Sequence, residues 1–189
     1  IGMWLLSECR RLWAAEGQEY DYPTLTQIAE EAEPFTSLIN PEDERFFKPD
    51  NMPGAIAGFC RETTQPEPAT HGSTVRCVLE SLALLYTQRL KEAQELTGEP
   101  INRLHIVGGG SRNALLNQFT ANACGVEVIA GPTEATALGN VLVQAITLGD
   151  LPDLASARKV VGQSMDVKSF QPKDSAVWEA AKTRFKELT

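Results

Sequence analysis

Apolar residues recur most regularly between positions 73 and 96, where they return every three or four residues. This spacing is typical of an amphipathic helix whose apolar stripe packs against a core. The stretch TGEP follows, in which Gly98 suits a left-handed position after the last turn and Pro100 prevents continuation. A long helix is therefore expected to end just before Gly98.

Three shorter helices are predicted before it. The first covers residues 2–16, the second covers residues 23–33 with Thr24 as its N-cap, and the third covers residues 52–63. Trp4, Trp13 and Trp178 all occupy apolar positions of helical patterns, which favours burial in the core.

Beyond residue 100 the pattern changes to short apolar runs that alternate with helical sequence. INRLHIV (101–107) predicts a strand buried on both faces, with His105 packed in the sheet, and VEVIAG (126–131) predicts a second strand. Helices are expected at 111–124 and 132–149, and after 150 with a break at SFQPKD (169–174). This order predicts two neighbouring parallel strands joined by a crossover helix.

Composition narrows the class of protein. With 189 residues, 42% of them hydrophobic and 22% charged, the chain has the composition of a globular domain. A formal charge of -8 argues against nucleic acid or an anionic membrane as the main partner. Because we find neither a membrane-length apolar run nor a signal peptide, we expect a cytoplasmic location. The chain starts at Ile1 rather than Met, which indicates part of a longer protein.

The four cysteines have no short pair spacing that would indicate a zinc site or a redox motif. Cys60 and Cys77 bracket a proline-rich connection, so their thiols are expected near one another. Whether they form a disulfide stays open.

The segment LHIVGGGSRNALLNQF (104–119) places three glycines between a strand and a helix. Such a corner brings bare backbone N–H groups and the positive helix end together, which suits an anionic group such as phosphate. The phosphate loop of nucleoside triphosphatases requires a lysine after the glycines, and none follows here. The dinucleotide fingerprint requires a third glycine at the position of Asn113, so it does not match either. From the residues alone, a tight turn without ligand and a helix-capping role for Asn113 remain alternatives.

HIVGGGSRNALLNQFTANACGVEVIAGPTEATALGNVLVQA resembles the nucleotide-binding end of the FGGY family of carbohydrate kinases. GMWLL, INPEDERFFKPDNMP and FCRETTQPEP agree with the family in the same order, so the resemblance covers nearly the whole chain. It implies an α/β fold: a truncated C-terminal actin-like (ribonuclease H-like) ATPase domain over residues 1–189, helix-rich with a small, partly parallel sheet.

The resemblance also implies a site for ATP. Gly108, Gly109 and Gly110 would approach the α-phosphate and ribose, and Asn113 would face the adenine. Ser7 in the first helix would border the adenosine pocket. Gly139, in EATALGN, would pack closely against an element behind that pocket.

The family's sugar pocket, first phosphate loop and catalytic Asp come from sequence that precedes this point, so no catalytic residue and no metal ligand is expected here. Magnesium would be held mainly elsewhere, and this chain alone is expected to be inactive. Within the family, the segments agree best with the branch that phosphorylates L-rhamnulose to L-rhamnulose 1-phosphate. Kinases for fuculose or xylulose, or a non-catalytic actin-like module, are the alternatives. The expected partners are ATP or ADP and a sugar, with no nucleic acid and no membrane.

Overall fold

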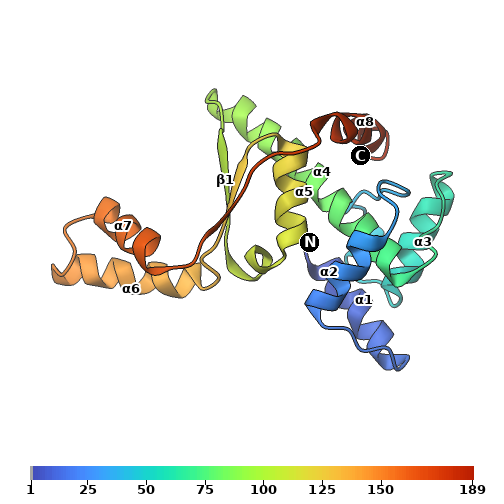
Figure 1. Ribbon diagram of the computed structural model, residues 1–189, viewed down its shortest axis with the longest axis horizontal. Helices are drawn as coiled ribbons and strands as arrows, with labels where there is room; N and C mark the ends of the chain where they lie inside the picture. The colour runs from blue at the N-terminus through green and yellow to red at the C-terminus, as the bar shows by residue number, and fades with distance from the viewer. Residues whose placement is uncertain (1) are drawn as a thin grey trace.

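A computed structural model describes residues 2–189 (Figure 1), so Ile1 lies outside the described residues. The elements follow in the order α1 (Trp4–Ala15), α2 (Tyr22–Glu31), η1 (Glu44–Phe46), α3 (Met52–Glu62), α4 (His71–Thr97), β1 (Arg103–Ile106), η2 (Gly108–Arg112), α5 (Ala114–Cys124), β2 (Glu127–Ala130), α6 (Ala135–Leu148), α7 (Leu154–Ser164), β3 (Lys168–Phe170) and α8 (Ser175–Lys186). The predicted helices before residue 100 and the end of α4 at a left-handed Gly98 are confirmed.

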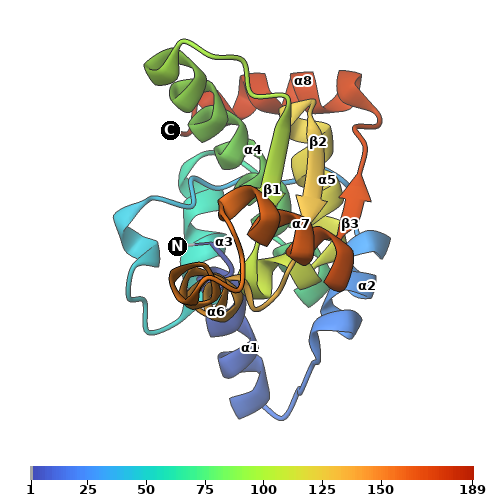
Figure 2. The ribbon, with the colours of Figure 1, turned by 90° about the vertical axis from the view of Figure 1, so that its left-hand side faces the viewer.

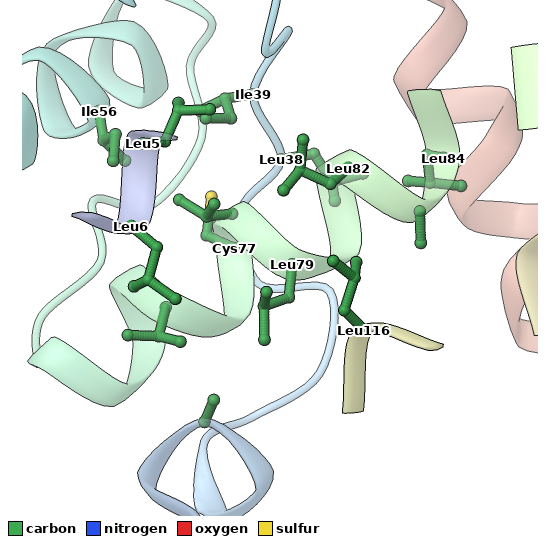
Figure 3. Close-up of a cluster of buried hydrophobic side chains, with 14 of the residues drawn as sticks. Leu5, Leu6, Leu38, Ile39, Ile56, Cys77, Leu79, Leu82, Leu84 and Leu116 are labelled. Atoms are coloured by element: carbon green, nitrogen blue, oxygen red, sulfur yellow. The ribbon is translucent and has the colours of Figure 1, made fainter. Parts of the chain in front are cut away.

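The long helix α4 forms the centre of the core. Its first half is buried, and Figure 3 shows apolar side chains from α1, α3, α5 and the 38–39 segment gathered around Leu79 and Leu82. Trp13 and Trp178 are buried as predicted, but the prediction for Trp4 is wrong, because its side chain is 44% exposed. An apolar position at the first turn of a helix can lie beyond the surface that the neighbouring helices cover.

The approach of α2 to α4 depends on glycine. A Cβ atom added to Gly72 would lie 2.3 Å from the carbonyl oxygen of Ile28, so a larger residue would push the two helices apart. Helix α2 begins one residue earlier than predicted, and its N-cap lies three residues earlier, because the Asp21 carboxylate accepts a hydrogen bond from the Thr24 N–H at 2.8 Å. Asp21, and not Thr24, is therefore the N-cap.

A buried ion pair ties α4 to the end of α2. The Arg76 Nε donates to the Glu80 carboxylate at 2.7 Å, and the Glu80 side chain is only 1% exposed. The Arg76 Nη1 donates to the carbonyls of Ala29, Glu30 and Ala32, while the backbone N–H of Phe35 donates to Glu80. Burial raises the pKa of Glu80 despite the neighbouring guanidinium.

At its N-terminal end α4 contacts an aromatic cluster. His71, the first residue of α4, stacks on Trp13 with ring centroids 4.1 Å apart. The Nδ1 atom of His71 lies 3.1 Å from the Tyr20 hydroxyl, and desolvation lowers the pKa of His71.

The sheet has the order β1-β2-β3. Strands β1 and β2 are parallel, as predicted, with Leu104 opposite Val128. Strand β3 pairs antiparallel to β2 and overlaps the start of the segment 169–174, which was predicted to be only a break between helices. Helix α5 packs on this sheet (Figure 2). The prediction that β1 is buried on both faces, with His105 packed in the sheet, is wrong. Leu104 and Ile106 are half-buried, while Arg103 and His105 are exposed.

Helices α6 and α7 project away from the rest of the molecule as an arm (Figure 1). Within the described chain α6 has no buried residue, and in α7 only Ala157 is buried. The predicted close packing at Gly139 is wrong, because a Cβ atom built there meets nothing within 4 Å. Among residues 2–189, no helix combines the length and apolar character needed to cross a membrane.

All four cysteines are free thiols in the structure. The thiols of Cys60 and Cys77 lie close enough to interact, which confirms that the proline-rich connection brings them together. This interaction and burial raise the pKa of Cys77.

Candidate functional site

The glycine turn, residues 108–110, lies at the carboxyl end of β1. Its first residue adopts a left-handed conformation, with a φ of 75° at Gly108, that favours glycine. The Gly108 N–H donates to the Pro132 carbonyl at 3.2 Å, and the Gly131 N–H donates to the Ile106 carbonyl at 2.8 Å. These two bonds connect the turn to the end of β2, so the sheet fixes where the turn begins.

The outer side of the glycine turn is open. A Cβ atom built on Gly108 or Gly109 meets nothing within 4 Å, and at Gly110 the nearest atom is Cγ2 of Ile106 at 3.9 Å. Outside η2 itself, the hydrogen bonds of the described chain do not use the N–H groups of Gly109 and Gly110. The turn therefore presents main chain to an approaching group.

The predicted helix beginning at Ser111 is divided into two parts. The 3-10 segment η2 covers Gly108–Arg112, and α5 begins at Ala114 with Asn113 as its N-cap. The Asn113 Oδ1 accepts the Leu116 N–H at 2.9 Å, so the capping role expected from residue type is present.

The same geometry decides what Asn113 has left for a ligand. Its side chain is 8% exposed, and no hydrogen bond among the described residues uses Nδ2. Because Nδ2 is not a fully buried atom, part of it is accessible to solvent. Asn113 thus keeps a side-chain amide donor that is not used within the described chain, while its acceptor is engaged by the helix.

Two further side chains hold the turn from inside. The Ser111 hydroxyl donates to the Gly108 carbonyl at 2.7 Å, and the Asn117 Nδ2 donates to the Ser111 carbonyl at 2.9 Å. Asn117 is completely buried. Neither residue was predicted as part of the site, and the available signal for Asn117 was a polar residue four positions after Asn113, one helical turn along the same face of α5.

The charges around the turn favour an anion. The N-terminus of α5 carries a partial positive charge, and the exposed Arg112 adds a full one. The nearest acidic strand residue, Glu127, begins β2 and therefore lies at the opposite end of the parallel pair. Hydrogen bonds from Ser169 and Arg103 lower the pKa of Glu127, which keeps its charge there.

Ser7 lies in a different environment from the turn. Its hydroxyl donates to the Met3 carbonyl at 3.1 Å and lies 3.3 Å from the Tyr22 hydroxyl, which connects α1 to α2. No hydrogen bond of residues 2–189 links Ser7 to residues 108–113. The structure thus brings Gly108, Gly109, Gly110 and Asn113 together, but gives Ser7 partners of its own.

A cavity of about 800 Å³ lies beside the turn, between the sheet and the arm. Val107, Gly131 and Pro132 line its inner end and apolar residues of α6 and α7 its outer part, but Gly108–Gly110 do not contribute. Within residues 2–189, no group of three His, Cys, Asp or Glu side chains is placed to hold a metal ion.

Comparison with known proteins gives one family. The sequence model described as "FGGY family of carbohydrate kinases, C-terminal domain" matches residues 1–148. A rhamnulokinase of Bacteroides thetaiotaomicron is 50% identical over 185 residues, which cover 98% of this chain and 37% of that protein. A rhamnulokinase of Bacillus subtilis is 42% identical over 174 residues, which cover 92% of this chain and 35% of that protein.

The fold agrees with that result. A crystal structure of Plasmodium falciparum glycerol kinase with ADP matches with a TM-score of 0.64 at 16% identity, over 88% of this chain and 33% of that chain. The chain therefore spans little more than a third of the curated relatives that it matches.

Proposed function

This chain belongs to the FGGY family of carbohydrate kinases, and we propose that residues 1–189 form the ATP-binding C-terminal domain of a rhamnulokinase. In the intact enzyme, the γ-phosphate of ATP would be transferred to the primary hydroxyl of L-rhamnulose to give L-rhamnulose 1-phosphate. The choice of sugar is supported by two rhamnulokinases that are 50% and 42% identical to this chain. Kinases of fuculose or xylulose remain the alternatives.

The open glycine turn is the observation that supports nucleotide binding. A phosphate and ribose would fit against Gly108–Gly110, because the glycines have no side chains and the space where Cβ atoms would lie is open. The Gly109 N–H, the start of α5 and Arg112 all favour negative charge at this place. Asn113 would donate through Nδ2 to a ring nitrogen of adenine, since its oxygen is engaged as the cap.

Magnesium bound to the phosphates would neutralise the charge that develops during phosphoryl transfer. We assign no ligand for it, and no catalytic residue, to this chain. We propose that the sugar pocket and the general base belong to the rest of the kinase, outside the third of its length that this chain matches in the relatives. This chain alone is accordingly expected to bind nucleotide without catalysing transfer.

The decisive experiment uses Asn113 in the intact kinase. Asn113→Leu removes both the cap and the N–H donors, whereas Asn113→Ser keeps a capping oxygen and removes only the amide donors. We expect both variants to raise the KM for ATP about tenfold or more and to change the sugar KM less than twofold, with loss of stability confined to Asn113→Leu. An unchanged KM for ATP in Asn113→Ser would contradict the base-facing role.

Calorimetry with ADP and assays with a panel of ketoses test the other parts of the proposal. Saturable heat with ADP is expected, together with a kcat/KM for L-rhamnulose above that for fuculose or xylulose. Absence of ADP binding would favour a non-catalytic actin-like module. A preference for another ketose would replace rhamnulose while keeping the kinase.

A further inference from the structure

We propose that Asn117 is a positioning residue for the glycine turn: its buried amide fixes the direction of the turn's N–H groups and so sets the affinity for the nucleotide. The inference rests on the proposed function and assigns a role to a residue that does not face the ligand.

The argument begins with the connected hydrogen bonds behind the turn. Asn117 Nδ2 donates to the Ser111 carbonyl, the Ser111 hydroxyl donates to the Gly108 carbonyl, and the Asn113 N–H donates to the Gly110 carbonyl. Two carbonyls of η2, those of Gly108 and Ser111, are therefore held by side chains, and that of Gly110 by the backbone.

Because a peptide unit is planar and trans, its C=O and the following N–H point in opposite directions. A bond that holds the Gly108 carbonyl therefore also fixes the direction of the Gly109 N–H, which no hydrogen bond of the described chain outside η2 uses. The bond from Asn117 holds the Ser111 carbonyl and so fixes the residue whose hydroxyl holds the Gly108 carbonyl. Three consecutive glycines have little conformational preference of their own, so these bonds supply the order that their side chains cannot.

The burial of Asn117 indicates that its amide is retained for this bond. The side chain is 0% exposed, and its Oδ1 has no partner among the described residues. A buried carbonyl oxygen without a partner destabilises a fold, and leucine at this buried position would avoid that cost. The contact that an apolar residue could not replace is the one from Nδ2 to Ser111.

The test compares Asn117→Leu with Thr120→Val in the intact kinase. Thr120 is also 0% exposed on α5, and its hydroxyl donates only within the helix, to the Leu116 carbonyl at 2.7 Å. Thr120→Val therefore removes a buried polar group of the same helix without touching the turn. The two readouts are hydrogen exchange of the amides of residues 109–113 without nucleotide, and the Kd for ADP.

For Asn117→Leu we expect exchange at residues 109–113 to become about tenfold faster and the Kd for ADP to rise about tenfold, since a disordered turn must be ordered on binding. The sugar KM should change less than twofold. Thr120→Val should leave both the exchange and the Kd within twofold of the unmodified protein.

Unchanged exchange in Asn117→Leu, or equal effects of Asn117→Leu and Thr120→Val, would overturn the proposal. If Asn117→Leu does not fold, Ser111→Ala removes the next bond in the series and has the same expected and contrary results. If the unmodified protein binds no ADP, the proposed function fails, while hydrogen exchange still decides whether Asn117 positions the turn.

Discussion

Helices α4 and α6 differ in burial in a way that their sequences do not suggest. Most of α4 between Gly72 and Leu85 is buried beneath the surrounding helices, although this helix also carries many charged residues. Helix α6 is rich in apolar residues, yet within the described chain none of them is buried, and Leu148 is 78% exposed. The comparison teaches that an apolar stripe contributes to stability only where another element removes it from water.

The same contrast separates the whole body, α1–α5 and α8, from the arm, α6 and α7. The body contains the apolar core, the buried ion pair and the aromatic cluster, whereas α6 and α7 mainly contact each other. The free energy of unfolding should therefore depend strongly on residues of the body and weakly on residues of the arm.

The largest effect is expected from Arg76→Met in the body. This change leaves the buried Glu80 carboxylate and three carbonyls at the end of α2 without their partner, and should lower the free energy of unfolding by about 4 kcal/mol. Denaturant titration measures it. Arg61→Met is the control, since its ion pair with Glu67 is exposed to solvent and should contribute little to stability. Similar losses for both would mean that burial does not separate the two pairs.

Leu82→Ala compared with Leu148→Ala tests the core against the arm directly. Leu82 is 0% exposed, so its truncation creates a cavity and should cost about 3 kcal/mol. Leu148→Ala should change the free energy of unfolding by no more than about 0.5 kcal/mol. A loss of several kcal/mol at Leu148 would show that α6 is covered in solution.

Two matched helix caps sharpen the comparison at a smaller scale. Asp21 caps α2 in the body, and Asp153 caps α7 in the arm by accepting the Ser156 N–H at 2.7 Å. Asp21→Ala should shift the main unfolding transition to lower denaturant concentration, because α2 loses its N-cap. Asp153→Ala should lower the helix content seen by circular dichroism and leave the main unfolding transition in place. A shift of that transition equal to the Asp21→Ala shift would indicate that the arm unfolds with the body.

The smallest expected effect concerns pH and Glu80. Burial raises the pKa of this carboxyl in the folded state, so the folded protein holds its proton more tightly than the unfolded chain does. The contribution of Glu80 to stability is therefore complete below the ordinary pKa of a glutamate and is lost as pH rises through the raised value. The difference in unfolding free energy between the unmodified protein and Glu80→Gln should follow that curve. A difference independent of pH would contradict it.

Much of the helical body was predictable, because the repeats in α1 to α5 are regular and their ends carry glycine, proline or capping residues. The parallel pairing of β1 and β2 followed from the order of strands and helices. Strand β3 was not predictable, because its three residues have no apolar run and pair through backbone bonds to β2. The exposure of His105 and Gly139 was missed since it depends on the distance between the arm and the sheet.

Within the candidate site, the glycine turn and Asn113 were predictable from the junction between strand and helix. The roles of Ser111 and Asn117 were not, because they depend on carbonyl directions that the sequence does not encode locally. The sequence also could not show that the Asn113 side-chain oxygen is engaged while its amide nitrogen is not, because this depends on the position of the Leu116 N–H.

The unbroken length of α4 has a mechanical consequence. Its 27 residues form a rod of about 40 Å, which contacts the Trp13–His71 stack at its first residue and packs against α5 along its middle. Because such a helix resists bending, a force that displaces the start of α5 is transmitted as a tilt of the whole rod. Movement of α5 would then reach the Trp13–His71 stack through α4.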